Sequence, residues 1–472
     1  MQKTFVLNLI LQIAINLIVK PLYIFGVDRT VNNIVGSSEY GFYFSLLNFS
    51  YILQMVNDFG IQNFTSKTMS EQPENASKYF SNLFIFKLLL SFVYFLLTFI
   101  IALGLGYDAA QLKLLLILTF VQVLSSFFLF FRANLSGLGF FKTDSFLSVF
   151  DRLGLLILCG FLLCYQFITA ENGIWILAVS QGVSMLLACL IAYFFLVKKI
   201  KHQWLDFDFD FLKKIIKDSF PFALIALLMT FYTRSDAVML ERLLQDNATE
   251  AGIYASSYRL LDALNSVTLV FGTLLLPMFS QQINAQKSTK PLLELSLTIV
   301  SFLGISASFS ICAFREPIVQ LLYPSATPYW ADLLGLLILS YIPLSLMYVL
   351  GAYSTAKNLL RPQHYLFIVI AMFNFGLNYF LIPFQKALGA ATTTLLTQCA
   401  VVIGFLVINQ FQLNWIKICK SLLYCGLYGF FLFFIQKNNW HWMAQFICAC
   451  SFALLCGAVL FGKDLLAHRS ND

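Results

Sequence analysis

The chain has 472 residues, of which 59% are hydrophobic and only 11% are charged, and its mean hydropathy is +0.79. Soluble globular domains carry roughly a quarter charged residues, so this composition excludes a soluble globule and predicts an integral membrane protein. The formal net charge of +7 does not indicate a nucleic-acid-binding protein, because the cations are spread along the chain and not gathered into one domain.

Apolar runs long enough to cross a bilayer recur from one end of the chain to the other. A spanning helix needs about 20 apolar residues, and about fourteen such runs are present. The predicted fold class is therefore all-α integral membrane. In chain order the predicted helices occupy residues 5–25, 40–64, 80–104, 111–131, 146–168, 173–197, 219–243, 252–282, 292–314, 331–355, 364–384, 389–409, 418–436 and 441–461.

The lysine and arginine residues indicate how these helices are oriented. With the N-terminus in the cytoplasm, most of the 30 fall in cytoplasmic loops. The positive-inside rule favours this orientation, and an even number of helices then places both termini in the cytoplasm.

Two short stretches share the pattern Glu-x-Gly-x-Tyr: residues 39–43 (EYGFY) and 250–254 (EAGIY). Six predicted helices separate them, and because six is even the two halves have the same orientation, as in transporters built from parallel repeats. The predicted organisation is a first lobe at 1–197, a cytoplasmic linker at 198–218, a second lobe at 219–410, and two further helices with a cytoplasmic tail at 411–472. The linker alternates lysines with apolar residues, so it is either an interfacial helix or an ordinary solvated connector.

Three cations lie inside stretches that otherwise predict lipid-buried helix: Lys20, Arg234 and Arg259. An ionisable group there is costly unless it faces a water-filled or protein-lined interior. At ~1.5 Å rise per residue, Lys20 and Arg234 lie roughly 22 Å from the cytoplasmic side, and Arg259 lies roughly 10 Å from the outer side. All three fall in the outer half of a hydrocarbon core about 30 Å thick, and we expect them to line one cavity for an anion.

Two aspartates accompany these cations. Asp262 lies one helical turn beyond Arg259, so the two can form an ion pair, and a purely structural pair is the alternative. Asp236 is two residues from Arg234 and is expected to face a different wall.

The remaining candidates are aromatic residues and prolines near the cations. Tyr23 and Tyr258 could stack on sugars or simply fill the core. Pro21 and Pro221 could let their helices bend.

Other charges in the apolar runs need no functional role. We expect Lys87, Arg152 and Asp58 to lie near the cytoplasmic ends of their helices and to reach the headgroups by snorkelling. The ten cysteines and four histidines are scattered, which makes a metal site or a disulfide framework unlikely to be the basis of function.

Five short motifs in chain order carry a family resemblance. They are Val35 to Gly41, Asn57 to Ile61, Arg132 to Phe141 with Gly137 and Gly139, Arg234-Ser235-Asp236 followed by Met239-Leu240, and Ala251 to Tyr254 followed by Tyr258-Arg259. Together, in this order, they resemble the multidrug/oligosaccharidyl-lipid/polysaccharide exporter superfamily, and the resemblance covers nearly the whole chain. Within it they are most similar to the O-unit flippases of the polysaccharide-biosynthesis branch.

The resemblance implies a V-shaped pair of six-helix lobes around a cavity lined by helices one, two, seven and eight. It implies a transporter, not an enzyme: a flippase that moves undecaprenyl-diphosphate-linked oligosaccharides across the bacterial inner membrane by alternating access, for O-antigen, capsule or exopolysaccharide assembly. A diphosphate suits buried arginine and lysine. The substrate-binding residues carried over by position are Lys20, Tyr23, Arg29, Arg234, Asp236, Tyr258, Arg259 and Asp262, with hinges at Pro21 and Pro221.

The partners implied are the lipid-linked oligosaccharide, membrane lipids, and a glycan polymerase with its chain-length machinery. No cofactor is expected, and coupling to a proton or sodium gradient is left open.

Three alternatives remain. A cation-coupled multidrug exporter of the same fold would need a more acidic cavity, and a flippase for a lipid-linked peptidoglycan precursor differs only in substrate. An integral-membrane enzyme would need clustered acids or histidines, and the predicted outer loops 26–39 and 315–330 carry few.

Overall fold

The computed structural model describes residues 18–71, 76–200, 209–244, 248–410, 415–438 and 440–466. Every regular element among these residues is a helix, which confirms the predicted fold class. Twelve of the helices are long and apolar enough to cross a membrane, so the chain is a multi-pass membrane protein.

The helices follow one another with short connections. Those in the first part of the chain are the π-helix η1 (Tyr23–Asp28), α2 (Arg29–Asp58), α3 (Ile61–Glu71), α4 (Ala76–Gly104), α5 (Ala109–Gly137), α6 (Phe141–Cys164), α7 (Gly173–Val197) and α8 (Phe209–Leu243). The rest are α9 (Thr249–Asn284), α10 (Lys290–Ala313), α11 (Arg315–Leu322), α12 (Pro328–Leu339), α13 (Tyr341–Ala356), α14 (Leu360–Gln385), α15 (Ala387–Ile408), α16 (Trp415–Gln436) and α17 (Trp442–Leu466).

The predicted number of spanning helices agrees approximately with the structure. Most of the first predicted helix, 5–25, lies outside the described residues, and the second corresponds to α2, which is not among the twelve. α2 is less apolar because it buries polar side chains, among them Ser45, Asn48, Ser50 and Asn57. From α4 onward the predicted and observed helix ends mostly differ by a few residues.

The prediction of an outer loop at residues 26–39 is wrong. The chain there continues as η1 and the beginning of α2, and the helix is broken only at Gly36, with φ 82° and ψ 170°. Glycine adopts positive φ without a Cβ penalty, so a single residue separates two helical segments. The other predicted outer loop, 315–330, contains the short helix α11.

α2 ends earlier than predicted, beside an ion pair whose lysine is buried and whose aspartate is partly exposed. Phe59 and Gly60 take positive φ values of 47° and 78°, which stops α2 at Asp58. Lys87 Nζ of α4 lies 2.9 Å from Asp58 Oδ1, and the Lys87 side chain is fully buried. The expectation that Lys87 snorkels to the headgroups is therefore wrong, because a carboxylate inside the protein already compensates its charge.

The described residues form two compact units, a first unit up to Ala255 and a second unit from Ser256. The division falls inside α9, so α8 belongs to the first unit, where it packs mainly on α2. Residues 209–218 of the predicted linker form the first part of α8, and residues 201–208 lie outside the described ranges. The ranges of the two predicted lobes and the interfacial location of the linker stay predictions.

The first unit is built around a phenylalanine core. α5 packs against α7, α3 and α2. The rings of Phe80 and Phe130 stack with centroids 5.6 Å apart, and those of Phe84 and Phe127 are also 5.6 Å apart. This core ties α4 to α5 and gives α2 a fixed surface to pack on.

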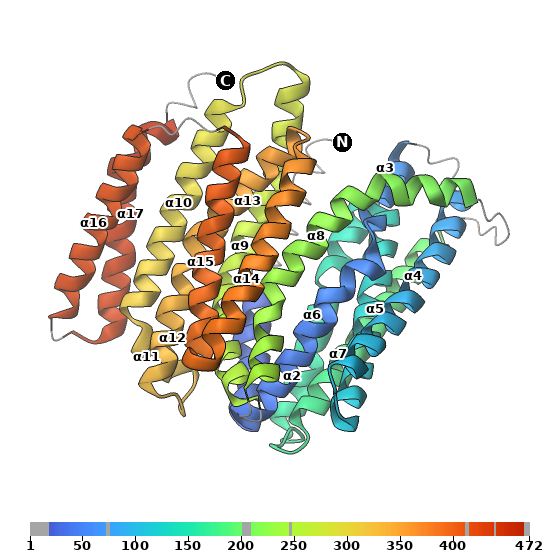
Figure 1. Ribbon diagram of the computed structural model, residues 1–472, viewed down its shortest axis with the longest axis horizontal. Coiled ribbons are helices and arrows are strands. Elements are labelled where there is room, and N and C mark those ends of the chain that lie inside the picture. The colour runs from blue at the N-terminus through green and yellow to red at the C-terminus, as the bar shows by residue number, and fades with distance from the viewer. Residues whose placement is uncertain are drawn as a thin grey trace. The chain divides into compact units, whose positions relative to one another are not determined.

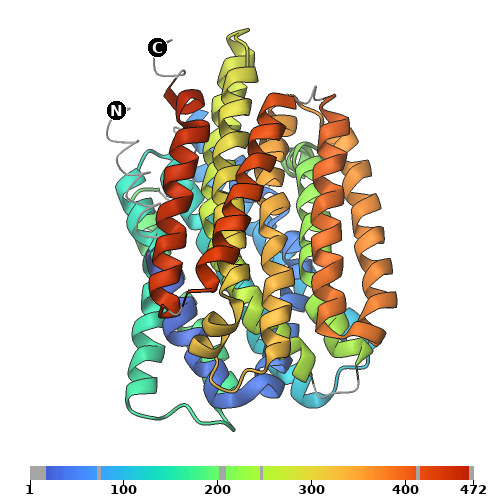
Figure 2. The same ribbon diagram turned by 90° about the vertical axis from the view of Figure 1, so that its left-hand side faces the viewer.

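In the second unit, α16 and α17 form a helical hairpin docked on α10 (Figure 1 and Figure 2). Ser306 Oγ lies 2.7 Å from Tyr424 Oη, and Ser310 Oγ lies 2.6 Å from Tyr428 Oη. Serine and tyrosine are each spaced by four residues, so the two hydrogen bonds repeat along one face of each helix. They fix the final pair of helices to the rest of the unit.

α8 changes direction along its length (Figure 1). Pro221 lies near the point where its polar first part meets the membrane-spanning part, Ser219–Leu243. Proline lacks an N–H and its ring clashes with the preceding turn, which bends a helix. The neighbouring Phe220 ring lies 6.2 Å from that of Phe59, so the bend adjoins the end of α2. A hinge role for Pro221 stays a prediction.

The two Glu-x-Gly-x-Tyr stretches contact each other within the first unit through their glycines. A Cβ added to Gly41 would lie 2.0 Å from the carbonyl oxygen of Ala248 and 2.5 Å from the nitrogen of Gly252. A Cβ added to Gly252 would lie 1.8 Å from the carbonyl oxygen of Ser37. The two backbones approach so closely that only glycine fits at both positions, which explains why both copies of the pattern carry it.

Replacing Gly252 by alanine should therefore destabilise the protein, because the new methyl group overlaps a backbone oxygen that cannot rotate away. Overpacking of this kind typically costs about 1–3 kcal/mol. Thermal unfolding of the detergent-purified protein would measure the loss. Gly104→Ala is the control, since a Cβ there meets nothing within 4 Å. Equal melting temperatures for the two variants would contradict the close contact.

Removing Lys87 should also be costly, because it leaves Asp58 without the partner described above. Breaking a buried pair from one side costs up to about 3–5 kcal/mol, whereas removing both charges costs less. We expect the double variant Lys87→Ala/Asp58→Ala to unfold at a higher temperature than the single variant Lys87→Ala. Strictly additive losses in this double-mutant cycle would show that the two side chains do not interact.

Candidate functional site

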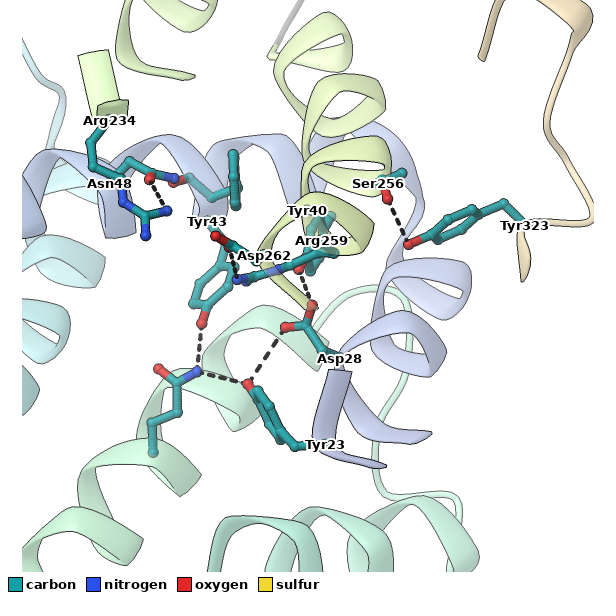
Figure 3. Close-up of polar contacts among 12 residues, drawn as sticks. Tyr23, Asp28, Tyr40, Tyr43, Asn48, Arg234, Ser256, Arg259, Asp262 and Tyr323 are labelled. Carbon is teal, nitrogen blue, oxygen red and sulfur yellow. Dashed lines mark hydrogen bonds and ion pairs between the residues drawn. The ribbon is translucent and has the colours of Figure 1, made fainter. Parts of the chain in front are cut away.

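Arg234 lies in the membrane-spanning part of α8, and two residues of α2 contact its guanidinium. Arg234 Nη1 donates a hydrogen bond of 3.3 Å to Asn48 Oδ1 (Figure 3). The guanidinium carbon also lies 5.4 Å from the centroid of the Tyr51 ring, within the range of a cation–π interaction. The predicted cation is thus half-buried inside the first unit, where Asn48 and Tyr51 are two of its contacts.

Asp236 has a different environment, as its spacing from Arg234 predicts. It is 2% exposed, and its Oδ2 accepts a hydrogen bond of 2.9 Å from the hydroxyl of Tyr254 in the first turns of α9. Tyr254 is the tyrosine of the second Glu-x-Gly-x-Tyr pattern. The contact ties α8 to α9 close to the glycine contact, and a substrate-binding role for Asp236 stays a prediction.

A polar network surrounds η1 (Figure 3). Asp28 is 1% exposed and accepts hydrogen bonds from the hydroxyls of Tyr40 and Tyr23, the latter at 3.5 Å. The side-chain amide of Gln181 in α7 donates to Tyr43 Oη at 2.6 Å and to Tyr23 Oη at 3.3 Å. A buried carboxylate, three phenols and an amide from three elements therefore form one connected group.

Sequence reasoning missed Asp28, which it placed in an outer loop with Arg29. The run of polar residues after position 27 is typical of a loop, but here the helix continues and the side chain of Asp28 points into the protein. The signal that was available is Pro21, because a proline disturbs the regular hydrogen bonding of a helix. π-helical turns of this kind are frequent at functional sites.

Lys20, Pro21 and Arg29 flank this network. Lys20 and Pro21 are helical and half-buried just before η1, and Arg29 is half-buried at the start of α2. Tyr23, also predicted, is buried within η1. The structure thus brings four of the predicted site residues onto one short stretch of the first unit.

Arg152 of α6 joins the same group. Its guanidinium carbon lies 5.3 Å from the centroid of the Tyr23 ring, and its Nε lies 3.5 Å from Asp151. Sequence reasoning expected Arg152 only to snorkel. The contact instead places a further cation beside the η1 network.

The end of α8 is anchored to the turn between α4 and α5. Gln111 Nε2 donates to Glu241 Oε1 at 2.7 Å, and Arg242 pairs with Glu241 and stacks on the Tyr107 ring at 4.2 Å. Burial is the largest influence on Tyr107 and raises the pKa of its hydroxyl, so the ring stays neutral. These contacts hold the C-terminal end of the helix that carries Arg234 and Asp236.

The second unit carries the remaining predicted residues. Arg259 Nη1 lies 3.8 Å from Asp262 Oδ2, which confirms the predicted pairing (Figure 3). Both side chains are partly exposed, at 13% and 21%, and the neighbouring Tyr258 is buried. The structure brings these three residues onto the first turns of α9 in this unit. Their convergence with Lys20 and Arg234 on one cavity stays a prediction.

No cluster of three or more histidine, cysteine or acidic side chains suited to a metal ion occurs in the part of the chain that the structure describes. The ten cysteines are free thiols.

Comparison with known proteins identifies the family. A family model described as "Polysaccharide biosynthesis protein" matches residues 6–282, which is more than half of the chain. No match was found among curated proteins.

The fold is shared with solved membrane transporters. The chain is similar to the structure titled "Lipid II flippase MurJ, inward closed conformation", with a TM-score of 0.72 and 16% identity over 98% of this chain and 99% of that one. It is also similar to a multidrug resistance MATE family transporter in an inward-facing conformation, with a TM-score of 0.62, 14% identity, and coverage of 85% and 97%. A MOP superfamily transporter from Pyrococcus furiosus gives a TM-score of 0.62 and 14% identity, covering 86% and 95%. The chain therefore belongs to the polysaccharide biosynthesis protein family and has the fold of the MOP superfamily of transporters.

Proposed function

We propose that the protein is a flippase that moves undecaprenyl-diphosphate-linked oligosaccharide repeat units from the cytoplasmic to the outer leaflet of the bacterial inner membrane. The repeat units would serve the assembly of O-antigen, capsule or exopolysaccharide. Transport would proceed by alternating access, and both termini would lie in the cytoplasm.

The observation that carries this proposal is the guanidinium of Arg234 inside a membrane-spanning helix. A cation there is expensive and is retained only where it serves a structure or a substrate. The planar donor fork of arginine suits two oxygens of a phosphate at once. A lipid-linked diphosphate would bring negative charge to this depth while its polyprenyl tail stays in the bilayer.

An aromatic residue beside one of the cations suits the sugar part of such a substrate. Tyr51 lies beside Arg234 and is half-buried. Phenol rings can stack on sugar faces while their hydroxyls bond to sugar hydroxyls. In the proposal, Lys20, Arg29, Arg259 and the aspartates Asp236 and Asp262 complete the binding site.

Two other cargoes are weaker candidates. If the protein were a multidrug exporter, its cationic compounds would be repelled by the positive side chains of Lys20, Arg152, Arg234 and Arg259. A flippase for a lipid-linked peptidoglycan precursor would use the same phosphate chemistry, and the solved structure titled lipid II flippase shares the fold. Only the glycan distinguishes that cargo from the one proposed, and the family match favours polysaccharide precursors.

The proposal also covers the partner proteins and the energy source of transport. The glycan polymerase and its chain-length machinery would take over the exported repeat unit. Coupling to a proton or sodium gradient would act on a buried carboxylate. Asp28 is one candidate, because it is 1% exposed and accepts hydrogen bonds from Tyr23 and Tyr40. Export that is unchanged in Asp28→Asn and insensitive to ionophores would contradict such coupling.

Replacing Arg234 or Arg259 by alanine should abolish surface-glycan export while the amount of protein in the membrane is unchanged. A hydrogen bond to a charged group contributes about 1.5–3 kcal/mol, so losing even one to the substrate lowers export by roughly tenfold or more, and losing the several that a guanidinium makes to a diphosphate abolishes it. Surface glycan in a strain lacking the native gene would be measured by gel or antibody.

Arg315→Ala is the control for these variants. Arg315 pairs with Asp332 at 3.1 Å, but both side chains are largely solvent-exposed, and such pairs contribute little. Normal glycan in both Arg234→Ala and Arg259→Ala would contradict the proposal.

The purified protein should catalyse neither glycosyl transfer nor hydrolysis of a lipid-linked oligosaccharide. The physical reason is that a flippase only moves its cargo between leaflets. Mass spectrometry of the lipid after incubation would detect a change in covalent structure. Turnover into any new covalent product would favour an integral-membrane enzyme instead.

A further inference from the structure

We propose that Asn48 and Tyr51 of α2 are positioning residues that hold the guanidinium of Arg234 ready for a diphosphate headgroup. This inference rests on the proposed function, because it assigns Arg234 a phosphorylated ligand. It adds two residues that neither the sequence motifs nor the comparisons single out. Both are neutral, and they come from a different helix than the arginine that they contact.

Asn48 is itself fixed before it meets Arg234. It is 2% exposed, and its Nδ2 donates a hydrogen bond of 2.7 Å to the carbonyl oxygen of Phe44 one turn earlier in α2. The amide group therefore has one orientation, with Oδ1 directed away from that carbonyl. Arg234 Nη1 donates to this Oδ1 at 3.3 Å. Figure 3 shows the two side chains pointing toward each other.

Tyr51 constrains a second side of the same group. It follows Asn48 by three residues, so the two side chains lie on one face of α2. The guanidinium carbon of Arg234 is 5.4 Å from the centroid of the Tyr51 ring. The hydrogen bond contacts an edge of the guanidinium and the ring lies beside it, so two side chains of α2 restrain the group.

This restraint matters because phosphate recognition by arginine is directional. The guanidinium carries five N–H donors in a flat fork, and two of them can bond to two phosphate oxygens only if the plane is correctly turned. A long side chain that is already ordered loses less entropy when the ligand arrives.

The simpler alternative is that Asn48 and Tyr51 merely tie α2 to α8. Polar contacts of this kind do stabilise membrane helix pairs. The two roles differ in how they respond to charge. Asn48→Asp would keep or strengthen a purely structural contact, because a carboxylate pairs well with arginine. The same change would weaken binding of a diphosphate, because the carboxylate occupies the fork and cancels the charge.

The test uses the full-length protein in nanodiscs of neutral lipid. The probe is undecaprenyl diphosphate, with uncharged undecaprenol as the reference ligand, and binding is measured by native mass spectrometry. We expect Asn48→Asp to weaken diphosphate binding about tenfold or more, and Asn48→Ala and Tyr51→Leu to weaken it by roughly three- to tenfold. Tyr51→Phe keeps the ring and should bind like the unaltered protein. Binding of undecaprenol should not change in any of them.

Asn134→Asp is the matched control. Asn134 is fully buried in α5, and its Nδ2 makes the same hydrogen bond to a carbonyl one turn earlier, that of Phe130 at 2.8 Å. Its Oδ1 has no hydrogen-bond partner among the described residues. If the Asn134→Asp variant binds the diphosphate normally, the effect of Asn48→Asp is not a general result of burying a carboxylate. If Asn134→Asp or Asn48→Ala fails to fold, the comparison of Tyr51→Leu with Tyr51→Phe gives the same test.

The outcomes separate this inference from the proposed function. Normal diphosphate binding by Arg234→Ala would overturn the role of Arg234 and with it the proposal of a phosphate site there. Loss in Arg234→Ala with normal binding in Asn48→Ala and Tyr51→Leu would overturn only the positioning role. If diphosphate binding were lost only in Asn48→Asp, the positioning role would also be overturned. That result would show that residue 48 is close to the ligand but that the native amide does not contribute to binding.

Discussion

An ionised side chain inside a hydrocarbon core is stable only where the protein itself supplies a partner. Lys87 has the carboxylate of Asp58, and Arg259 has that of Asp262. Arg234 donates a hydrogen bond to Asn48 and lies beside the ring of Tyr51. At each of these three positions a side chain of the protein therefore contacts the cation.

Much of the fold can be predicted from the sequence, because a long apolar run in a membrane can form few structures other than a spanning helix. The ends of α7 and of the spanning part of α8 were predicted correctly from apolarity alone. The errors occur where polar residues lie inside the protein. The stretch 26–39 was predicted as a loop, but it is helical on both sides of Gly36, and its polar residues Asp28 and Asn32 are buried in the protein.

The candidate site was only partly predictable, for the same reason. Depth along a helix can be calculated from residue number, so Arg234 and the pairing of Arg259 with Asp262 could be predicted. Which residue of another helix meets a given side chain depends on packing that one sequence does not reveal. Asn48, Tyr51 and the burial of Lys87 therefore emerged only from the structure. The contact between Gly41 and Gly252 could likewise not be predicted from the similarity of the two Glu-x-Gly-x-Tyr stretches.

α2 takes part in nearly every polar contact that organises the first unit. It contributes Asp58 to the ion pair with Lys87, Asn48 to Arg234, Tyr40 to Asp28 and Gly41 to the glycine contact. These polar and small residues are also why α2 is less apolar than the helices that meet the criteria for a membrane span. Because polar groups are costly in lipid, a helix can carry so many only if other helices surround it. Low apolarity within an otherwise apolar chain is thus a sign of a central helix, and it is from such a helix that a protein-lined site for a charged substrate can be built.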